Sequence, residues 1–242
     1  NARICADGSR EAAAMPPRKM TSLFVAMALL ASATPAQSAP LSAAATPDTP
    51  SGVWNQWRGP ARNGHCPGDW WPERLTEENV QQLWRVELGP SYSGPIVDAT
   101  TVYTTETVDK RDEVVTAYDR TTGERKWRMS WAGAMSVPFF AARNGSWIRS
   151  TPTVDEESVY VAGMLDVLVC LDKETGEERW RADFVERFET PKPDFGFVCS
   201  PLVVGDHVYV QAGASFVKVD KKTGETVWRS MKDGGGMFGS AF

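Results

Sequence analysis

Short apolar runs, separated by turn residues, recur along the chain from about residue 95 onward. A first run follows a proline in each unit, a second contains a tyrosine within Val-Tyr pairs, and a third ends at an aspartate. Runs of this length, bounded by Gly, Pro, Asp and Ser, predict β-strands joined by hairpins. The three prolines are Pro95, Pro152 and Pro201, the tyrosines are Tyr103, Tyr160 and Tyr209, and the aspartates are Asp119, Asp172 and Asp220.

A nine-residue motif, D-x-x-T-G-x-x-x-W, closes each unit and occurs three times. It reads DRTTGERKW at 119–127, DKETGEERW at 172–180 and DKKTGETVW at 220–228, at intervals of 53 and 48 residues. A period near fifty with short strands is typical of propeller blades, each made of four antiparallel strands. The sequence therefore predicts an all-β fold, a β-propeller with about three blades present of an expected seven or eight.

The repeated residues suit structural roles better than catalytic ones. Glycine permits a backbone with positive φ, while Asp and Thr side chains can cap amides across the same turn. The tryptophan is large enough to cover the seam between blades. We interpret all twelve as blade-docking residues: Asp119, Thr122, Gly123, Trp127, Asp172, Thr175, Gly176, Trp180, Asp220, Thr223, Gly224 and Trp228.

A fourth Trp-Arg pair, Trp84-Arg85, precedes the three complete units. It predicts that Leu83 to Leu88 forms the outermost strand of a blade, so blades begin at residue 83. The sequence stops at Phe242, where a fourth unit would begin, whereas a closed ring needs about four to eight blades. We therefore expect this sequence to be a fragment truncated at its C-terminus.

Composition narrows the partners and the chemistry. The chain is mildly acidic, with a net charge of −5 and no basic cluster, which gives no electrostatic reason to expect nucleic acid or an anionic membrane. With two His and no C-x-x-C pair, a zinc site is not expected. Pairing of Cys170 with Cys199 and free buried thiols are both open, as is the state of Cys66.

The N-terminal part predicts export. Residues 1–14 are unassigned, and residues 15–38 resemble a secretory signal, with Arg18 and Lys19 before the apolar run from Leu23 to Ala31. Cleavage is expected after Ala36-Gln37-Ser38, or alternatively after Ala31-Ser32-Ala33. Residues 39–53 are expected to form a disordered linker, and 54–82 an irregular strap on the partial propeller at 54–242. We expect no transmembrane span in the mature chain and a periplasmic or extracellular location.

The D-x-x-T-G-x-x-x-W motif resembles the tryptophan-docking repeat of the pyrroloquinoline quinone (PQQ) β-propeller family. Ala117-Tyr118-Asp119 matches the usual A-x-D start of that repeat, whereas Cys170 and Lys218 replace the alanine in the other copies. The strap sequence WNQWRGPARNG is similar to the opening of secreted bacterial PQQ-like repeat proteins. The resemblance covers roughly residues 54–242.

Two functional classes follow from this resemblance. Non-catalytic members bind a protein partner, whereas quinoprotein alcohol and sugar dehydrogenases hold PQQ and calcium and oxidise alcohols with a catalytic Asp. The chain lacks the vicinal cysteines typical of those enzymes, and no acidic residue matches a calcium-site motif. The prediction is thus an exported binding or scaffolding module without its own catalytic site, in envelope protein assembly or extracellular ligand binding. No cofactor is evident, and the protein, peptide or carbohydrate ligand is unidentified. The alternative is a PQQ- and Ca-dependent dehydrogenase with its catalytic residues outside this sequence.

Two long connections between units are the candidate binding face, because long loops on rigid scaffolds often carry function. Trp127 to Pro152 is 25 residues, and Trp180 to Pro201 is 21. Aromatic and basic side chains there suit a peptide, a sugar or a quinone; alternatively, the loops only cover the blades. The candidate residues are Arg143, Asn144, Trp147, Arg149, Asp194, Phe195 and Phe197.

Overall fold

The computed structural model describes residues 52–66 and 73–232. The predicted signal sequence at 15–38, the upstream residues 1–14 and all but the last two linker residues lie outside this part. Within it, all twelve strands belong to three four-stranded antiparallel sheets, which confirms the predicted all-β fold and the blade-like units.

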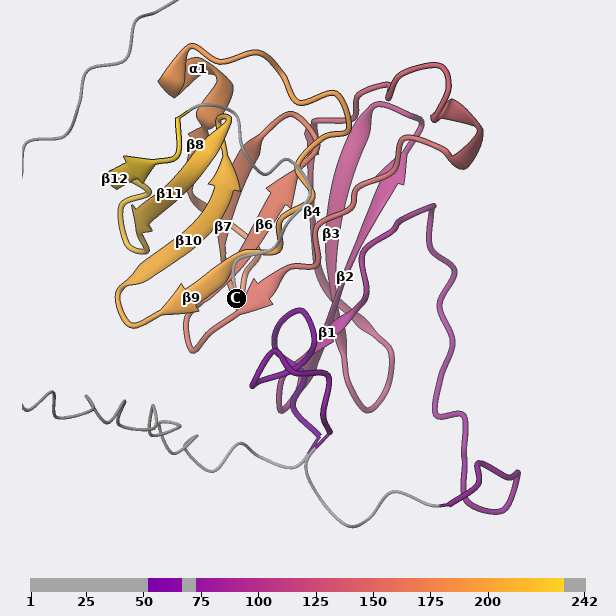
Figure 1. Cartoon of the computed structure of the whole chain (residues 1–242). Helices are drawn as coiled ribbons and strands as arrows, with labels where there is room; N and C mark the ends of the chain where they lie inside the picture. Colours follow the sequence, from indigo (N-terminus) through magenta and orange to yellow (C-terminus); the bar gives the residue numbers. More distant parts are fainter. Residues whose placement is uncertain (1–51, 67–72, 233–242) are drawn as a thin grey trace, which may run out of the picture. The chain divides into compact units, whose positions relative to one another are not determined.

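Sheet 1 contains four strands in sequence order, β1 (Ile96–Val97), β2 (Thr101–Val108), β3 (Asp112–Asp119) and β4 (Arg125–Ala132). Figure 1 shows β2, β3 and β4 side by side. The register brings Tyr103 opposite Ala117, and Ala117 in turn opposite Trp127. Alternate side chains of each strand therefore face one neighbouring sheet, as the period of two requires.

Sheets 2 and 3 repeat this order. Sheet 2 contains β5 (Thr153–Val154), β6 (Ser158–Gly163), β7 (Val167–Asp172) and β8 (Glu178–Asp183). Sheet 3 contains β9 (Leu202–Val204), β10 (His207–Ala212), β11 (Ser215–Asp220) and β12 (Thr226–Ser230). The predicted first, second and third apolar runs of each unit are its first three strands, and the strand after each Thr-Gly carries the tryptophan.

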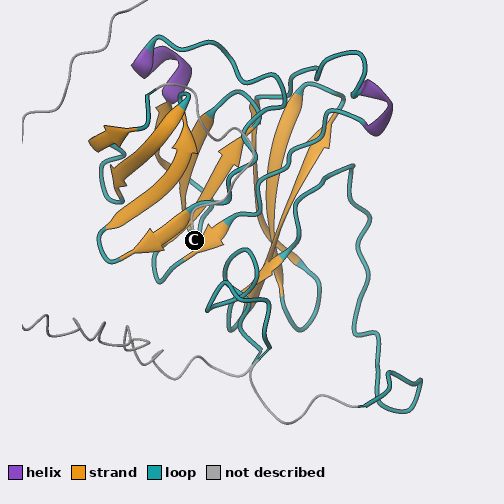
Figure 2. Ribbon diagram, in the orientation of Figure 1, coloured by secondary structure: helices purple, strands orange, loops and turns teal. Residues whose placement is uncertain are grey.

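The long connections carry the helical segments of the described chain (Figure 2). The 3-10 helix η1 (Ala142–Asn144) lies between β4 and β5, and α1 (Phe184–Phe188) follows β8. Asp183 caps α1 by accepting from the Glu186 amide. No described helix is long and apolar enough to cross a membrane.

The prediction of an outer strand at Leu83 to Leu88 is wrong. The structure gives this segment no strand, since none of the three sheets includes it and no ladder of hydrogen bonds can form without a neighbouring strand. Its tryptophan is nevertheless docked, because Trp84 Nε1 donates to the Arg120 carbonyl at 2.9 Å. The repeated tryptophan contact therefore forms even where sheet pairing does not.

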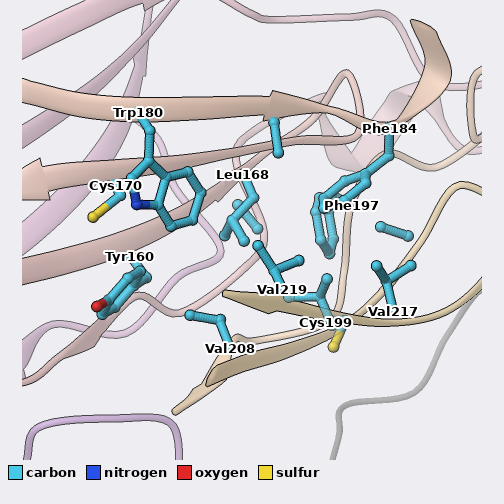
Figure 3. Close-up of a cluster of buried hydrophobic side chains, with 14 residues drawn as sticks. Tyr160, Leu168, Cys170, Trp180, Phe184, Phe197, Cys199, Val208, Val217 and Val219 are labelled. Carbon is cyan, nitrogen blue, oxygen red and sulfur yellow. The ribbon is translucent and has the colours of Figure 1, made fainter. Parts of the chain in front are cut away.

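The core between sheets 2 and 3 is formed by side chains from both (Figure 3). Trp180 and Tyr160 lie at one end, and Phe184 and Phe197 pack edge to face at the other, with ring centroids 6.4 Å apart. Cys170 and Cys199 are both buried in this cluster and are not bonded to each other. Burial raises the pKa of the Cys170 thiol to about 11, so this side chain packs as a neutral apolar group.

The segment that begins at Trp54 contacts the first strand of each sheet or the residues just before it. Trp54 pairs with Val97 of β1 through two backbone bonds, and the Asn55 carbonyl accepts from Val154 of β5. Further along, Arg62 donates to the Pro201 carbonyl at 3.2 Å. Three sheets are thus linked by one short stretch of chain along their first strands.

Candidate functional site

The docking turn, defined as the D-x-x-T-G turn after β3, β7 or β11, is closed by its own side chains. In the first copy, Asp119 Oδ1 accepts from the amides of Thr121 and Thr122, and the Thr122 hydroxyl accepts from the Glu124 amide. Gly123 has φ +74° and donates to the Asp119 carbonyl. The same bonds recur in the other two copies, and both glycines there also have φ +74°.

Trp84, Trp127 and Trp180 each dock onto the docking turn that follows in the chain. Trp127 Nε1 donates to the Lys173 carbonyl at 2.9 Å, and its ring lies on Gly176, where an added Cβ would be 2.5 Å from Trp127 Cε3. The same arrangement joins Trp84 to Gly123 and Trp180 to Gly224. Glycine is therefore required twice over at this position, for its positive φ and for the close approach of the ring.

Trp228, the third tryptophan of the motif, lies at the outer face of sheet 3. It is 39% exposed, whereas Trp127 and Trp180 are 8% and 9% exposed. Its ring packs against Phe216 and Tyr209, with centroids 5.5 and 6.2 Å away. The docked and the exposed tryptophan thus share a sequence motif and differ in what covers them.

A lysine in the docking turn also reaches back to the preceding sheet. Lys173 Nζ lies 3.4 Å from Asp98 Oδ2, and Lys221 Nζ lies 3.3 Å from Asp155 Oδ2. Each aspartate also accepts from the hydroxyl of the tyrosine five residues later, for example from Tyr103. These partly buried ion pairs add to the tryptophan contact at the same end of the seam.

At the other end of the seam between sheets 1 and 2, the two sheets are joined by a buried carboxylate that the sequence analysis does not predict. Glu113, near the start of β3, is fully buried. Its Oε1 accepts from the Met164 amide of sheet 2 at 2.7 Å, and its Oε2 accepts from Trp131 Nε1 at 2.9 Å. Burial raises its pKa to about 7, although both bonds and nearby Arg181 favour the charged form.

A second carboxylate holds the same end of the next seam. Asp166 lies 53 residues after Glu113, at the equivalent position of the repeat, and is 4% exposed. Its Oδ2 accepts from the Gly213 amide of sheet 3 at 2.6 Å, and burial raises its pKa to about 6. We call these two contacts the carboxylate clasps.

The first long connection places three of the predicted site residues around one hollow. Arg143, Asn144 and Trp147 line a cavity of about 340 Å³, together with Lys110 from the hairpin between β2 and β3. The cavity is basic, because both of its charged wall residues are cations. Arg149 lies apart from it and stacks over the Tyr92 ring, 4.9 Å from its centroid.

The second long connection places two predicted residues around another hollow. Asp194 and Phe197 line a cavity of about 220 Å³ that Asp166 also lines. Phe197 is 2% exposed and belongs to the core between sheets 2 and 3 as well as to the cavity wall. The cavity therefore joins a predicted loop site to the second carboxylate clasp.

An aromatic patch connects the two long connections. It consists of Phe139, Phe140 and Phe195, with the Phe140 ring 5.8 Å from Phe139 and 6.0 Å from Phe195. Phe139 is 91% exposed and Phe140 is 69% exposed. We call the surface formed by this patch and the two cavities the loop face. Phe195 is one of the residues predicted from the sequence, whereas the more exposed Phe139 and Phe140 are not among them.

A calcium site of the kind that the dehydrogenase alternative needs would require several oxygen ligands close together. In residues 52–66 and 73–232, no group of three His, Cys, Asp or Glu side chains is arranged to hold a metal. The described residues therefore offer no cluster of such side chains for a calcium ion.

Comparison with protein families gives one match. The model described as "Outer membrane protein assembly factor BamB" matches residues 111–240, which is more than half of the chain. A search of curated proteins found no significant match.

Comparison with solved structures gives partial matches to related propellers. BamB from Moraxella catarrhalis is 17% identical with a TM-score of 0.43, and the match covers 59% of this chain and 38% of that one. A europium-containing methanol dehydrogenase is 22% identical with a TM-score of 0.42, covering 59% and 25%. A quinohemoprotein alcohol dehydrogenase from Comamonas testosteroni is 25% identical with a TM-score of 0.43, covering 59% and 21%. The matches thus span less than two fifths of these structures' lengths.

Proposed function

The chain belongs to the PQQ-repeat β-propeller family described as outer membrane protein assembly factor BamB, and from this membership we propose that it is an exported binding module. Its partner is a polypeptide, held on the loop face, and its role is scaffolding in the assembly of envelope proteins. The aromatic patch at Phe139, Phe140 and Phe195 is the observation that carries this proposal.

The patch has the chemistry of a protein-binding surface. Two of its three rings are largely exposed to water, although burying one aromatic side chain contributes roughly 2–3 kcal/mol. Aromatic side chains dominate the energetics of protein interfaces, and charged groups at the rim select the partner. Phenylalanine offers no hydrogen bond to sugar hydroxyls, so a polypeptide with apolar side chains suits this patch better than a carbohydrate.

The sheets below support the patch. Phe139 and Phe140 lie between β4 and β5, and Phe195 lies between β8 and β9. Each connection begins at a strand whose tryptophan is docked on the next unit. A loop surface fixed to a rigid scaffold loses less conformational entropy on binding than a free loop does.

Export is proposed from the sequence at residues 15–38, where a basic start precedes an apolar run that is too short to span a membrane. Expression with this leader, followed by cell fractionation and N-terminal sequencing, tests it. We expect the mature protein outside the cytoplasm, beginning at Ala39 or, for the alternative cleavage, at Thr34. An uncleaved protein in the cytoplasm would contradict export.

Peptide selection tests the binding role. Displayed random peptides are selected on the chain and then measured against Phe139→Ser/Phe140→Ser. We expect the selected peptides to bind this double variant at least about tenfold more weakly, as for the loss of two aromatic anchors. A matched control, Leu75→Ser/Val204→Ser, removes two other exposed apolar side chains and is expected to change nothing.

Two results would overturn the proposal. One is a set of peptides that bind the double variant as tightly as the original chain. The other is dye-linked oxidation of an alcohol by the protein after PQQ and Ca²⁺ are added, because turnover would assign it to the dehydrogenase class instead.

A further inference from the structure

The two carboxylate clasps occupy the same repeat position, but their bonding differs. Glu113 uses both oxygens, one for the Met164 amide and one for the indole of Trp131. The residue equivalent to Trp131, 53 positions later, is Phe184, which has no N–H to donate. Phe184 is fully buried, as an apolar side chain at this position of the core should be. Asp166 therefore has no equivalent of the indole N–H that donates to Glu113.

Asp166 also lacks a cation. Within the described chain, no Lys, Arg or His nitrogen lies within 4.0 Å of its carboxylate, and no nearby cation favours its charged form. Nearby Asp183 adds a further negative charge. Glu113, in contrast, lies in the field of Arg181. An isolated buried carboxylate is costly unless donors or a cation reach it.

Beside Asp166 there is room for such a group. The aspartate lines the 220 Å³ cavity, whose walls include Pro191, Pro193 and Ala212. Gln211 lines it too, and its Oε1 is buried without a hydrogen-bond donor in the described part of the chain. The lining of one small cavity thus includes a carboxylate with one identified donor and a glutamine whose buried amide oxygen has none.

The charged groups at the rim of the cavity do not supply the positive charge that Asp166 lacks. Lys192 and Asp194 line the cavity with opposite charges. Arg229 is engaged elsewhere, because it donates to the Ser215 hydroxyl and to the Gly213 carbonyl and stacks over Phe188. The cavity as a whole is negative, in contrast to the basic cavity beside Arg143 and Lys110.

We infer that the Asp166 cavity binds a guanidinium or ammonium group, the basic side chain of a polypeptide held on the loop face. The inference deepens the proposed function and rests on it. Both groups are rich in N–H donors and carry the missing charge. Guanidinium is the better fit, because its planar fork can donate two parallel hydrogen bonds to a carboxylate, and because it is more weakly hydrated than ammonium.

A capped arginine amide, N-acetyl-arginine amide, is the probe for this site. Its control is the citrulline analogue, which has nearly the same shape and no charge. Amide shifts of Ala212 and Gly213 are followed by NMR in the full 242-residue chain. We expect saturable shifts with the arginine probe and at least about tenfold weaker binding of citrulline, as for loss of a charged hydrogen bond.

Three further comparisons sharpen the test. Asp166→Asn, which is isosteric and still able to accept from Gly213, should weaken the arginine probe at least about tenfold, whereas rim variant Asp194→Asn should change it less than about threefold. In the unaltered chain, affinity should fall at least about fivefold between pH 7.5 and pH 5 as Asp166 is protonated. This last measurement requires no variant to fold.

The outcomes separate this inference from the proposed function. Equal binding of arginine and citrulline, shifts confined to residues outside the cavity, or affinity independent of pH would overturn the cation site. If peptides still bind through Phe139 and Phe140 in that case, the proposed function stands alone. If the probe binds as expected but no peptide can be selected, the cavity holds a cation and the polypeptide assignment falls.

Discussion

The two ends of each seam between sheets are held differently. At the docking-turn end, both seams have the same contact, with Trp127 and Trp180 each donating to a lysine carbonyl at 2.9 Å. At the loop-face end, the clasp changes from Glu113 with two donors to Asp166 with one. The uniform end gives the repeat its geometry, and the variable end leaves the loop face free to differ chemically from blade to blade.

The largest expected effect compares a docked with an exposed tryptophan. Trp180→Ala removes a nearly fully buried ring and its hydrogen bond to Lys221, so the free energy of unfolding should fall by about 3–5 kcal/mol. Trp228→Ala removes a ring that is 39% exposed and should cost no more than about 2 kcal/mol. Urea denaturation followed by circular dichroism measures both. Equal losses would show that docking adds nothing to local packing.

The glycine under the ring gives the next largest effect. In Gly176→Ala the methyl group would meet the Trp127 ring and hold an unfavourable positive φ, so we expect a loss of at least about 3 kcal/mol. Gly205→Ala is the matched control, because Gly205 has φ +57° but nothing within 4 Å of an added Cβ. It should cost only about 1 kcal/mol. Urea denaturation measures the free energy of unfolding of both variants. If both lose a similar amount, backbone strain alone explains the effect and the contact with the Trp127 ring contributes nothing.

The raised pKa values of the carboxylate clasps predict that the free energy of unfolding depends on pH, with an effect of intermediate size. Glu113 has a folded pKa of about 7 against 4.5 for an unperturbed group, so the folded state binds more protons between these values. The free energy of unfolding should therefore fall as pH rises from about 4.5 to 7, by about 2–3 kcal/mol from this residue.

The variant Glu113→Gln checks this slope. The glutamine can still accept from the Met164 amide but cannot titrate, so most of the pH dependence should disappear. The smaller slope that remains should lie between about pH 4 and 6 and come from Asp166. Urea denaturation at a series of pH values is the measurement. An unchanged slope in the variant would place the titrating group elsewhere.

The smallest expected effect concerns the lysine of the docking turn. Lys173→Met removes the ion pair with Asp98 and should lower the free energy of unfolding by less than about 1 kcal/mol, with less effect in high salt. Its control is Lys222→Met, at an exposed position of the third turn, which should change nothing. A loss above about 2 kcal/mol would contradict the minor role assigned to this ion pair.

The sequence predicts the docking-turn end well because its contacts are local and demanding. Positive φ at Gly123 permits few alternatives to glycine, and the turn caps lie within three residues of Asp119. Because of these constraints the same residues recur in each copy, and the repeat, the four strands of each unit and the all-β fold can be predicted from them. The exception is Leu83 to Leu88, which carries the Trp-Arg pair of the repeat but has no neighbouring strand in the described part of the chain.

The clasps leave no such pattern. Glu113 and Asp166 differ in residue type, and Ala214 stands at the equivalent position of the third unit. Their amide partners lie 51 and 47 residues away, and a backbone amide places no demand on the partner's side chain. The available signal was an acidic residue at the same offset of 53, within β3 in one unit and directly before β7 in the next. Only the structure shows that Trp131 donates a hydrogen bond to Glu113 and that Phe184, at the equivalent position, cannot donate one to Asp166.

Titration of both clasp carboxylates by carbon-detected NMR, with and without N-acetyl-arginine amide, tests this difference most directly. The account predicts that the pKa of Asp166 starts near 6 and falls when the probe binds, while the pKa of Glu113 stays near 7. Equal shifts at both residues, or no shift at Asp166 with the probe in excess, would contradict it.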